Sequence, residues 1–398
     1  MARCNSKVDS SVNIKYSASG RGAVETLVST SASASSDYTS HVLLSGLKPD
    51  TVYQYLVECI ASGVVSKSGI MTFHTAPMST EPTPVSFVWA GDLAGQGWGR
   101  SPNVTVTSAF NGQVLNEGYV MFEVMRQHKP DFLIFQGDFI YADNKIFPTV
   151  NLPAALGGGV WVNNPTKEFV AVTLEDFRSN YKYNFGDSKL QAFLQEVPVY
   201  PQWDDHEVVN NWYPGQVLYQ PRFANYPNNT SVDMMAANAR QAFFEYWPIM
   251  GDKIYRSQRH GKHLEIFFLD QRTYRNANGY NNETFKTSML GAEQLMWLKN
   301  GLKTSTATWK IVSADDPLTI ITGGPGDYDT WVQGNNQVLG REFEVAEILD
   351  FIKTEEIKGV TFITSDVHFA AVMSYDPARA TFKNFNPFYE VCISVALL

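Results

Sequence analysis

Long apolar segments and an excess of positive charge are both missing from this sequence. No run of roughly 18 or more apolar residues occurs in it, so we expect no transmembrane helix. The opening residues, MARCNSK, contain no apolar stretch of the signal-peptide kind, so the chain as written shows no signal peptide. Lys and Arg number 31 against 40 Asp and Glu, and the resulting formal net charge of −9 argues against a nucleic-acid scaffold.

Cysteine is also scarce, with Cys4, Cys59 and Cys392 as the only three in 398 residues. Cys4 and Cys59 could pair with each other in an oxidising compartment, which would leave Cys392 free. Three buried thiols are the equally weighted alternative. None of the three lies in a segment that carries recognisable chemistry, so the function has to be sought in other residue types.

Aspartates at the ends of apolar runs are the most informative feature that is present. Short runs rich in β-branched and aromatic residues are typical of buried strands, and ligands of layered α/β folds gather beyond the carboxyl ends of strands. A lone aspartate there is more often a turn residue or a helix cap, but six in the same relative place favour a site. The six runs are Ser86–Asp92, Phe132–Asp138, Val199–Asp205, Leu264–Asp270, Trp309–Asp315 and Val360–Asp366.

Two of these aspartates stand close to a second residue that binds metals. In the segment GDFIY, Asp138 is followed by Tyr141, and a carboxylate beside a phenolate suits a trivalent, iron-like ion. In SDVH, Asp366 and His368 alternate in extended geometry and can point into the same site. Both segments therefore predict a metal centre at the strand ends.

The segment WDDHE adds a group that can move a proton. Asp205 stands beside His206, a pairing expected where the carboxylate binds metal and the imidazole protonates a leaving group. A lone histidine is more often a capped or core residue. The neighbouring carboxylate and the strand end favour the catalytic interpretation.

These blocks resemble a known pattern, that of the purple acid phosphatases among the calcineurin-like metallophosphoesterases. The matching residues, in order, are Asp92, Gly137-Asp138 with Tyr141, Asp205-His206-Glu207, Val312–Asp315 and Asp366-Val367-His368. The segments WAGDLAGQGWG, TLEDFRSNYKYN, WDDHEVVNNW and SDVHFA resemble even more closely the PhoD-like alkaline phosphatases and the related metal-dependent phospholipase D enzymes. The resemblance covers nearly the whole chain and implies a four-layer α/β/β/α metallophosphoesterase domain, which hydrolyses phosphate esters with a metal-bound hydroxide.

The same resemblance implies two metal sites. The first metal would be held by Asp92, Asp138, Tyr141 and His368, and the second by the bridging Asp138 with Asp205, Asp315 and Asp366. Asp316 could equally be the ligand from its block in place of Asp315. Carboxylates replace two histidines of the purple enzymes, which favours Ca²⁺, Mg²⁺ or Mn²⁺ over Zn²⁺ in the second site, while the PhoD-like relatives imply iron in the first. The cysteine that many of those relatives use as an iron ligand is in none of the blocks.

His206 would then donate a proton to the leaving oxygen, with Glu207 or Asp204 orienting its other ring nitrogen. Because the net charge of −9 repels an anionic substrate, local cations must attract it. Arg178 and Arg272 are candidates for this substrate binding. For each of them a solvated surface charge is the equally weighted alternative.

The first 77 residues differ from the rest, because they are rich in Ser, Thr and Val and lack helical periodicity. The runs His41–Leu44, Val52–Glu58 and Ser68–His74 predict short strands, and the phrase LKPDTVYQYLVE resembles the end of a fibronectin type III-like domain. About four strands fit this part. The predicted divisions are a partial β-sandwich over 1–77, a linker over 78–84, and a catalytic domain over 85–398 with a C-terminus that looks truncated.

Helices are expected to alternate with the strands of the catalytic domain, as a layered α/β enzyme requires. The predicted helices are Tyr119–His128, Ser188–Glu196, Ser231–Tyr246, Gly291–Leu302 and Gly340–Thr354.

An alkaline phosphatase of the D type is the function that the resemblance predicts. A phosphodiesterase of the phospholipase D type is the alternative among enzymes, because pocket walls and not these motifs decide between monoesters and diesters. The substrate would be a small phosphate ester or a phospholipid, and family analogy places the protein outside the cytoplasm, secreted or periplasmic. A catalytically silent secreted binding protein is the alternative from another class, and the intact Tyr141 and His206 argue against it.

Overall fold

The computed structural model describes residues 1–20, 25–93, 105–107, 112–116, 118–151, 159–163 and 167–393. Residues 94–99, the second half of the WAGDLAGQGWG segment, lie outside the described residues. Within the described part of the chain, no helix is long and apolar enough to cross a membrane.

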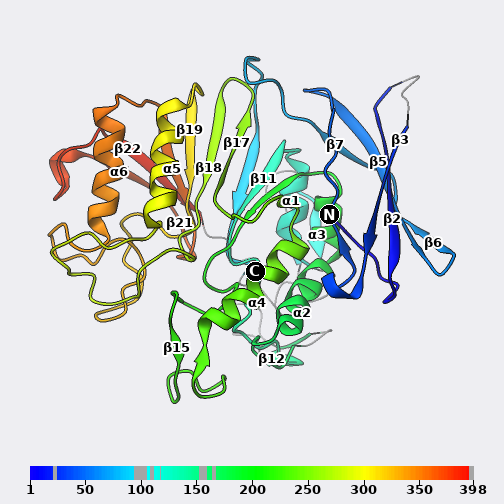
Figure 1. Cartoon of the computed structure of the whole chain (residues 1–398), viewed down its shortest axis with the longest axis horizontal. Coiled ribbons are helices and arrows are strands. Elements are labelled where there is room, and N and C mark those ends of the chain that lie inside the picture. The colour runs from blue at the N-terminus through cyan, green and yellow to red at the C-terminus, as the bar shows by residue number, and fades with distance from the viewer. Residues whose placement is uncertain are drawn as a thin grey trace.

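Two sheets lie face to face in the larger part of the molecule (Figure 1). The first has three parallel strands in the order β14-β11-β8, namely β8 (Phe87–Ala90), β11 (Phe132–Gln136) and β14 (Val199–Gln202). The second has the order β17-β18-β19-β20-β22-β21, with β17 (Arg256–His260), β18 (Leu264–Phe268), β19 (Trp309–Ser313), β20 (Val360–Thr364), β21 (Ala370–Tyr375) and β22 (Phe388–Ile393). Only the outer strands β17 and β21 of this second sheet run antiparallel to their neighbours.

Helices cover the outer face of each sheet. Four of them pack on the three-stranded sheet: α1 (Val120–Gln127), α2 (Leu174–Phe185), α3 (Ser188–Leu194) and α4 (Val232–Tyr246). Two pack on the six-stranded sheet: α5 (Gly291–Thr304) and α6 (Glu342–Thr354). The order helix, sheet, sheet, helix confirms the predicted four-layer α/β/β/α architecture.

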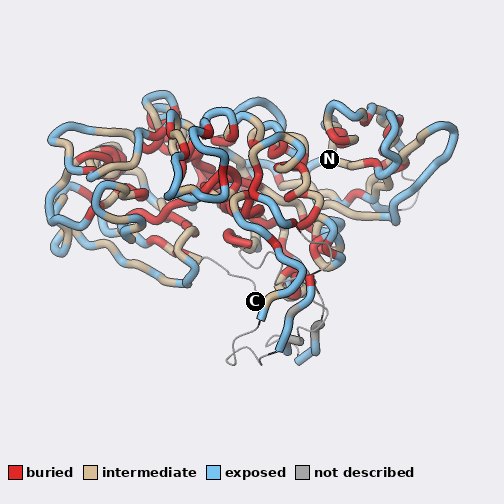
Figure 2. Tube along the Cα trace, turned by 90° about the horizontal axis from the view of Figure 1, so that it is seen from below, coloured by how far each residue is buried: buried red, intermediate tan, exposed pale blue. Residues whose placement is uncertain are grey.

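Apolar side chains fill the space between the two sheets. Phe132 and Ile134 of β11 meet Ile266 and Phe268 of β18 and Ile311 of β19, all of them less than a tenth exposed. The parallel strands β11, β18 and β19 are covered on both faces, by the other sheet and by helices. This explains why their sequences are continuously apolar. Figure 2 shows the buried residues concentrated along the middle of the molecule.

The N-terminal part forms a separate group of strands beside α2 and α4 (Figure 1). Its larger sheet has the order β3-β2-β5-β6 with β7 also paired to β5. The strands here are β1 (Ala2–Arg3), β2 (Ser10–Ala18), β3 (Thr26–Ala32), β4 (Thr39–Ser40), β5 (Val52–Ala61), β6 (Val64–Lys67) and β7 (Met71–His74). These seven exceed the roughly four expected, because the polar strands β2 and β3 carry too little apolar signal to be recognised in the sequence.

The strand predicted over His41–Leu44 is wrong, and the predicted pairing of Cys4 with Cys59 is present. Residues His41–Leu44 form no strand, since they leave the sheet and His41 instead makes a hydrogen bond of 3.0 Å to the backbone carbonyl of Glu245 on α4. Cys4 and Cys59 form a disulfide, with Cα atoms 5.8 Å apart, and Cys392 is a buried free thiol.

Three short antiparallel strand pairs lie outside the main sheets. They are β9 (Thr105–Thr107) with β10 (Val114–Asn116), β12 (Thr149–Asn151) with β13 (Val160–Val162), and β15 (Val217–Leu218) with β16 (Thr230–Ser231).

Candidate metal centre

The carboxyl ends of the parallel strands of both sheets meet at one edge of the molecule's core. Buried amide side chains join the two sheets there. Gln136, the last residue of β11, donates from Nε2 to the backbone carbonyls of Ala314 (3.0 Å) and Ile363 (2.8 Å). Gln202, the last residue of β14, donates to the carbonyl of Ser313 (3.0 Å). The loops that follow these strands therefore begin at fixed positions.

Left-handed backbone conformations turn several of the predicted ligands into the site. Asp92 (φ 59°), Asp138 (φ 53°), Asp366 (φ 70°) and His368 (φ 55°) all have positive φ. Such conformations are uncommon for residues other than glycine and cluster at functional sites. Gly137, with φ 94°, precedes Asp138 and packs so closely on Asp204 that a Cβ atom would lie 2.4 Å from the Asp204 Cβ.

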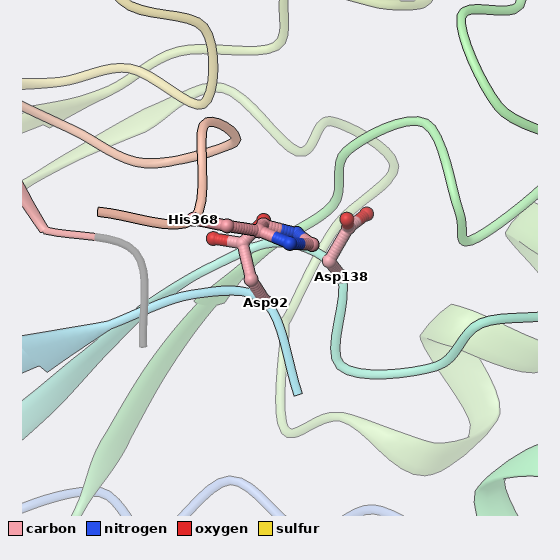
Figure 3. A group of neighbouring side chains, drawn as sticks. All are labelled: Asp92, Asp138 and His368. Atoms are coloured by element: carbon pink, nitrogen blue, oxygen red, sulfur yellow. The ribbon is translucent and has the colours of Figure 1, made fainter. Parts of the chain in front are cut away.

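The first predicted site is assembled from three loops (Figure 3). Ligand atoms of Asp92, Asp138 and His368 all lie within 4.8 Å of one another. The Tyr141 hydroxyl is 3.0 Å from His368 Nε2, and His368 Nε2 is 3.4 Å from Asp92 Oδ1. The structure thus brings together all four residues predicted for the first metal.

The second predicted site lies beside the first and shares its acidic character. Asp138 and Asp205 lie within one group of potential ligands, and Asp205 and Asp366 lie within another that also contains Asp204. Asp315 follows β19 at the same edge and is fully buried, with Arg272 as its ion-pair partner at 3.7 Å.

The oxygen atoms of this region fit the binding of cations. Asp92 Oδ1, Asp205 Oδ1 and both carboxylate oxygens of Asp315 are buried and make no hydrogen bond to any described residue. A buried carboxylate without partners is costly, and cations are the groups that would satisfy it. These orphaned oxygens point to metal ions as the missing partners of the site.

Crowding of acidic groups changes their protonation when no metal is bound. Burial, together with the charge of Asp205, raises the pKa of Asp138 well above its ordinary value. Burial and the charge of Asp204 likewise raise the pKa of Asp315 and Asp366. Metal binding in this region is therefore expected to release protons.

The choice between Asp315 and Asp316 is informed by their partners. Asp316 Oδ1 accepts a hydrogen bond of 3.0 Å from Arg272, and its Oδ2 lies 3.5 Å from Arg275. Asp316 is therefore occupied by two guanidinium groups, whereas Asp315 keeps both oxygens without a hydrogen-bond partner. Neither residue belongs to a group of potential metal ligands among the described residues, so Asp315 stays a prediction, with its unpartnered oxygens in its favour.

The burial of Arg272 does not support the substrate-binding role predicted from the sequence. Its side chain is fully buried, and its guanidinium contacts Asp204 (2.7 Å), Asp329 (2.9 Å) and Asp316 (3.0 Å). A substrate in solution cannot reach it. Arg272 instead offsets the negative charge beneath the second site.

Arg178 is also in the wrong place for the role that was predicted. It lies on α2 and pairs with Glu245 of α4 at 2.6 Å, and it donates to the backbone carbonyl of Ser35 at 2.7 Å. Its guanidinium joins the N-terminal strands to the helices. The structure therefore does not support its assignment to the substrate.

His206 has a partner that was not anticipated. Its Nδ1 lies 2.7 Å from Asp143 Oδ1, and its ring stacks on that of Tyr141 with centroids 4.1 Å apart. Glu207 does not orient it, because the Glu207 carboxylate instead accepts from the backbone N–H groups of Asp138 (2.9 Å) and of other residues.

Charge around His206 keeps its imidazole protonated. Burial alone would lower the pKa of His206, but the negative charges of Asp143 and Asp205 raise it to about 10. Burial alone would raise the pKa of Asp143, but the charge and hydrogen bond of His206 outweigh it, so the pKa of this carboxyl group is lowered. In the metal-free protein these charges favour an imidazolium paired with a carboxylate.

Comparison with known proteins places this geometry among the phosphatases. A family model described as PhoD-like phosphatase matches residues 87–396. Alkaline phosphatase D of Bacillus subtilis (strain 168) is 25% identical over an alignment of 348 residues that covers 83% of this chain and 53% of that protein. Purple acid phosphatase 13 of Arabidopsis thaliana is 32% identical over 134 residues, covering 32% of this chain and 21% of that protein. The chain thus spans about half the length of alkaline phosphatase D and less of the plant protein.

Solved structures agree in fold. A structure of PhoD matches with a TM-score of 0.74 and 22% identity, covering 98% of this chain and 71% of that one. The purple acid phosphatase PPD1 from yellow lupin (Lupinus luteus) seeds matches with a TM-score of 0.55 and 12% identity, covering 98% of this chain and 60% of that one.

Proposed function

Because the chain belongs to the PhoD-like phosphatase family, we propose that it is a phosphoric ester hydrolase that depends on two metal ions. The observation that carries this proposal is the set of buried carboxylate oxygens without partners at the shared strand edge. These oxygens accept no hydrogen bond from a described residue, and Asp92 and Asp205 each belong to a group of potential metal ligands. Alkaline phosphatase activity of the D type is the function that fits them best.

The ligands suggest which ions bind. Asp92, Asp138, Tyr141 and His368 would hold the first metal, and a phenolate in this set favours iron. Asp138 would be shared with the second metal, whose other ligands would be Asp205, Asp315 and Asp366. Oxygen-only coordination of this kind favours Ca²⁺, Mg²⁺ or Mn²⁺. When bound, the two cations would activate a water molecule and offset charge on the phosphoryl group.

His206 is the proton donor in this proposal. Asp143 holds the ring through Nδ1, and the stacked Tyr141 ring limits its rotation. The remaining nitrogen, Nε2, lies 3.9 Å from Asp205 Oδ1 and therefore faces the metal ligands. An imidazolium in this position can transfer its Nε2 proton to the leaving oxygen of an ester.

We also propose that the protein works outside the cytoplasm. The Cys4–Cys59 disulfide supports this, since such bonds persist in oxidising compartments and are rare in reducing ones. The substrate would be a small phosphate ester.

A substrate panel tests the proposed function. Phosphate release from nitrophenyl phosphate, from alkyl phosphate monoesters and from phosphodiesters would be measured with the metal-loaded protein. Hydrolysis of monoesters is the expected result, and faster hydrolysis of diesters would support the phospholipase D type instead. Hydrolysis of neither class by a protein that contains both metals would overturn the proposal and favour a binding protein.

A further inference from the structure

Asp204 and Arg272 form a buried pair next to Asp205 and Asp366, two of the predicted ligands of the second metal. Arg272 has no exposed side-chain surface, and its Nε donates to Asp204 Oδ1 at 2.7 Å. The far side of the guanidinium is fixed by Asp329, whose two oxygens lie 2.9 and 3.1 Å from Nη1. Arg272 is thus held on opposite sides, and one oxygen of Asp204 is held with it.

The other oxygen of Asp204 has no partner. Asp204 is 1% exposed, and its Oδ2 is buried without a hydrogen bond to any described residue. Asp204 also offers an oxygen that lies within 4.8 Å of ligand atoms of both Asp205 and Asp366. The ion pair with Arg272 gives Oδ1 a partner but leaves Oδ2 without one. A buried, fixed and unpaired oxygen among carboxylates is costly when it is charged, and a cation near it would offset that cost.

We propose that Asp204 is a ligand of the second metal and that Arg272 is the positioning residue that orients it. The proposal rests on the proposed function in taking Asp205 and Asp366 as ligands of that metal. Asp204 would bind the ion through Oδ2 while Arg272 keeps Oδ1, so the carboxylate binds in a single, preset orientation. Arg272 also supplies a positive charge that offsets part of the repulsion among the acidic ligands.

Calcium titration of the variant Asp204→Asn tests this directly. The full chain would be depleted of exchangeable divalent ions with a chelator, and Ca²⁺ binding would be measured by calorimetry. We expect the affinity to fall about 10–100-fold or more, since losing even a supporting residue of a metal site has an effect of that size. The melting temperature of the metal-free variant should not fall, because the amide keeps the hydrogen bond from Arg272 and removes a repelling charge.

Asp270→Asn is the matched control. Asp270 is equally buried just after β18, but both of its oxygens are occupied: Oδ2 by Thr273 Oγ1 at 2.6 Å, and Oδ1 by Trp203 Nε1 at 3.0 Å and by the backbone N–H of Arg272 at 3.2 Å, bonds that an amide oxygen can keep. This variant should melt at a lower temperature and bind Ca²⁺ as the wild type does. Arg272→Lys, which keeps the charge but loses the planar fork, should weaken Ca²⁺ binding with little change in fold by circular dichroism.

The outcomes separate this inference from the proposed function. Wild-type affinity in Asp204→Asn, or a fall in melting temperature as its only effect, would show that Asp204 is structural and would overturn the inference. Weakened Ca²⁺ binding in Asp204→Asn would support it even if the wild type hydrolysed no ester. Conversely, an active wild type whose Asp204→Asn variant binds Ca²⁺ normally would leave the proposed function standing without this ligand.

Discussion

At the scale of single residues, the proposed assignment of iron to the first site depends on Tyr141. Its hydroxyl lies 3.0 Å from His368 Nε2, and burial together with the charge of Asp138 raises the pKa of Tyr141, so a phenolate there would need a bound cation. We predict that the protein contains iron and shows a visible phenolate-to-iron absorption band, and that Tyr141→Phe abolishes this band. Absorption spectroscopy together with metal analysis measures both. A colourless, fully active enzyme that contains only zinc would disprove the assignment.

His206 allows a second test at this scale. If it protonates the leaving oxygen, His206→Ala should keep both metals and lose on the order of 10²–10⁴ in turnover. The loss should shrink for nitrophenyl phosphate, whose leaving group needs little protonation. Asp143→Asn should show the same dependence on the leaving group with a smaller loss, because the imidazole remains but is no longer held as an imidazolium. Equal losses for good and poor leaving groups would mean that His206 only organises the site.

The residues that were missed share a physical cause. The candidate ligands could be proposed because each follows an apolar strand in the sequence, and Asp92, Asp138 and His368 do lie close together. Asp143 and Arg272 act through partners 63 and 68 residues away, His206 and Asp204, and such pairing leaves no local pattern. For the same reason the burial of Arg272 was not foreseen.

At the scale of elements, strand ends and amphipathic helices were predictable and one polar helix was not. The runs ending on Asp138 and Asp366 form β11 and β20, and the helix expected over Ser231–Tyr246 is α4, which begins one residue later. The missed helix is α2. Its first turn is closed by a capping box between Thr173 and Asp176, but its buried face includes Asn180 and Asn184, so the apolar periodicity is weak.

The loop after β11 depends on Gly137. Alanine there would adopt φ 94° and place its Cβ 2.4 Å from the Asp204 Cβ and 2.6 Å from the Asp204 backbone nitrogen. We predict that Gly137→Ala destabilises the protein by more than the about 1–2 kcal/mol that a left-handed backbone costs, and that it impairs metal binding. Chemical unfolding and metal analysis measure the two effects.

Gly251→Ala provides the control for this prediction. Gly251 has φ 97°, but a Cβ atom there would meet nothing within 4 Å. This variant should be destabilised only by the cost of the left-handed backbone, and it should keep its metals and activity. Equal effects of the two substitutions would show that close packing at Gly137 is unimportant.

At the scale of the whole molecule, the buried acids make the stability of the metal-free protein depend on pH. Burial and neighbouring charges raise the pKa of Asp138, Asp315 and Asp366, and burial raises that of Glu207 to about 7. Above about pH 4 the folded state then holds more protons than the unfolded chain, so its stability falls as pH rises.

Thermal unfolding of the chelated protein measures this effect. We expect a higher melting temperature at about pH 5 than at about pH 8, and we expect added Mn²⁺ to stabilise most at the higher pH. A melting temperature that rises with pH in the absence of metal would show that these carboxyl groups are not buried together.

We propose, for the molecule as a whole, a two-metal site that has an oxygen-only second position and hydrolyses phosphate esters. Its most direct test is to remove the metals with a chelator and to titrate each ion back while following phosphate release. We predict that Ca²⁺, Mg²⁺ or Mn²⁺ restores activity better than Zn²⁺, and that Asp366→His, which places a second imidazole near His368, shifts the preference toward Zn²⁺. A wild type that already prefers Zn²⁺, or a variant with an unchanged order of ions, would contradict the claim.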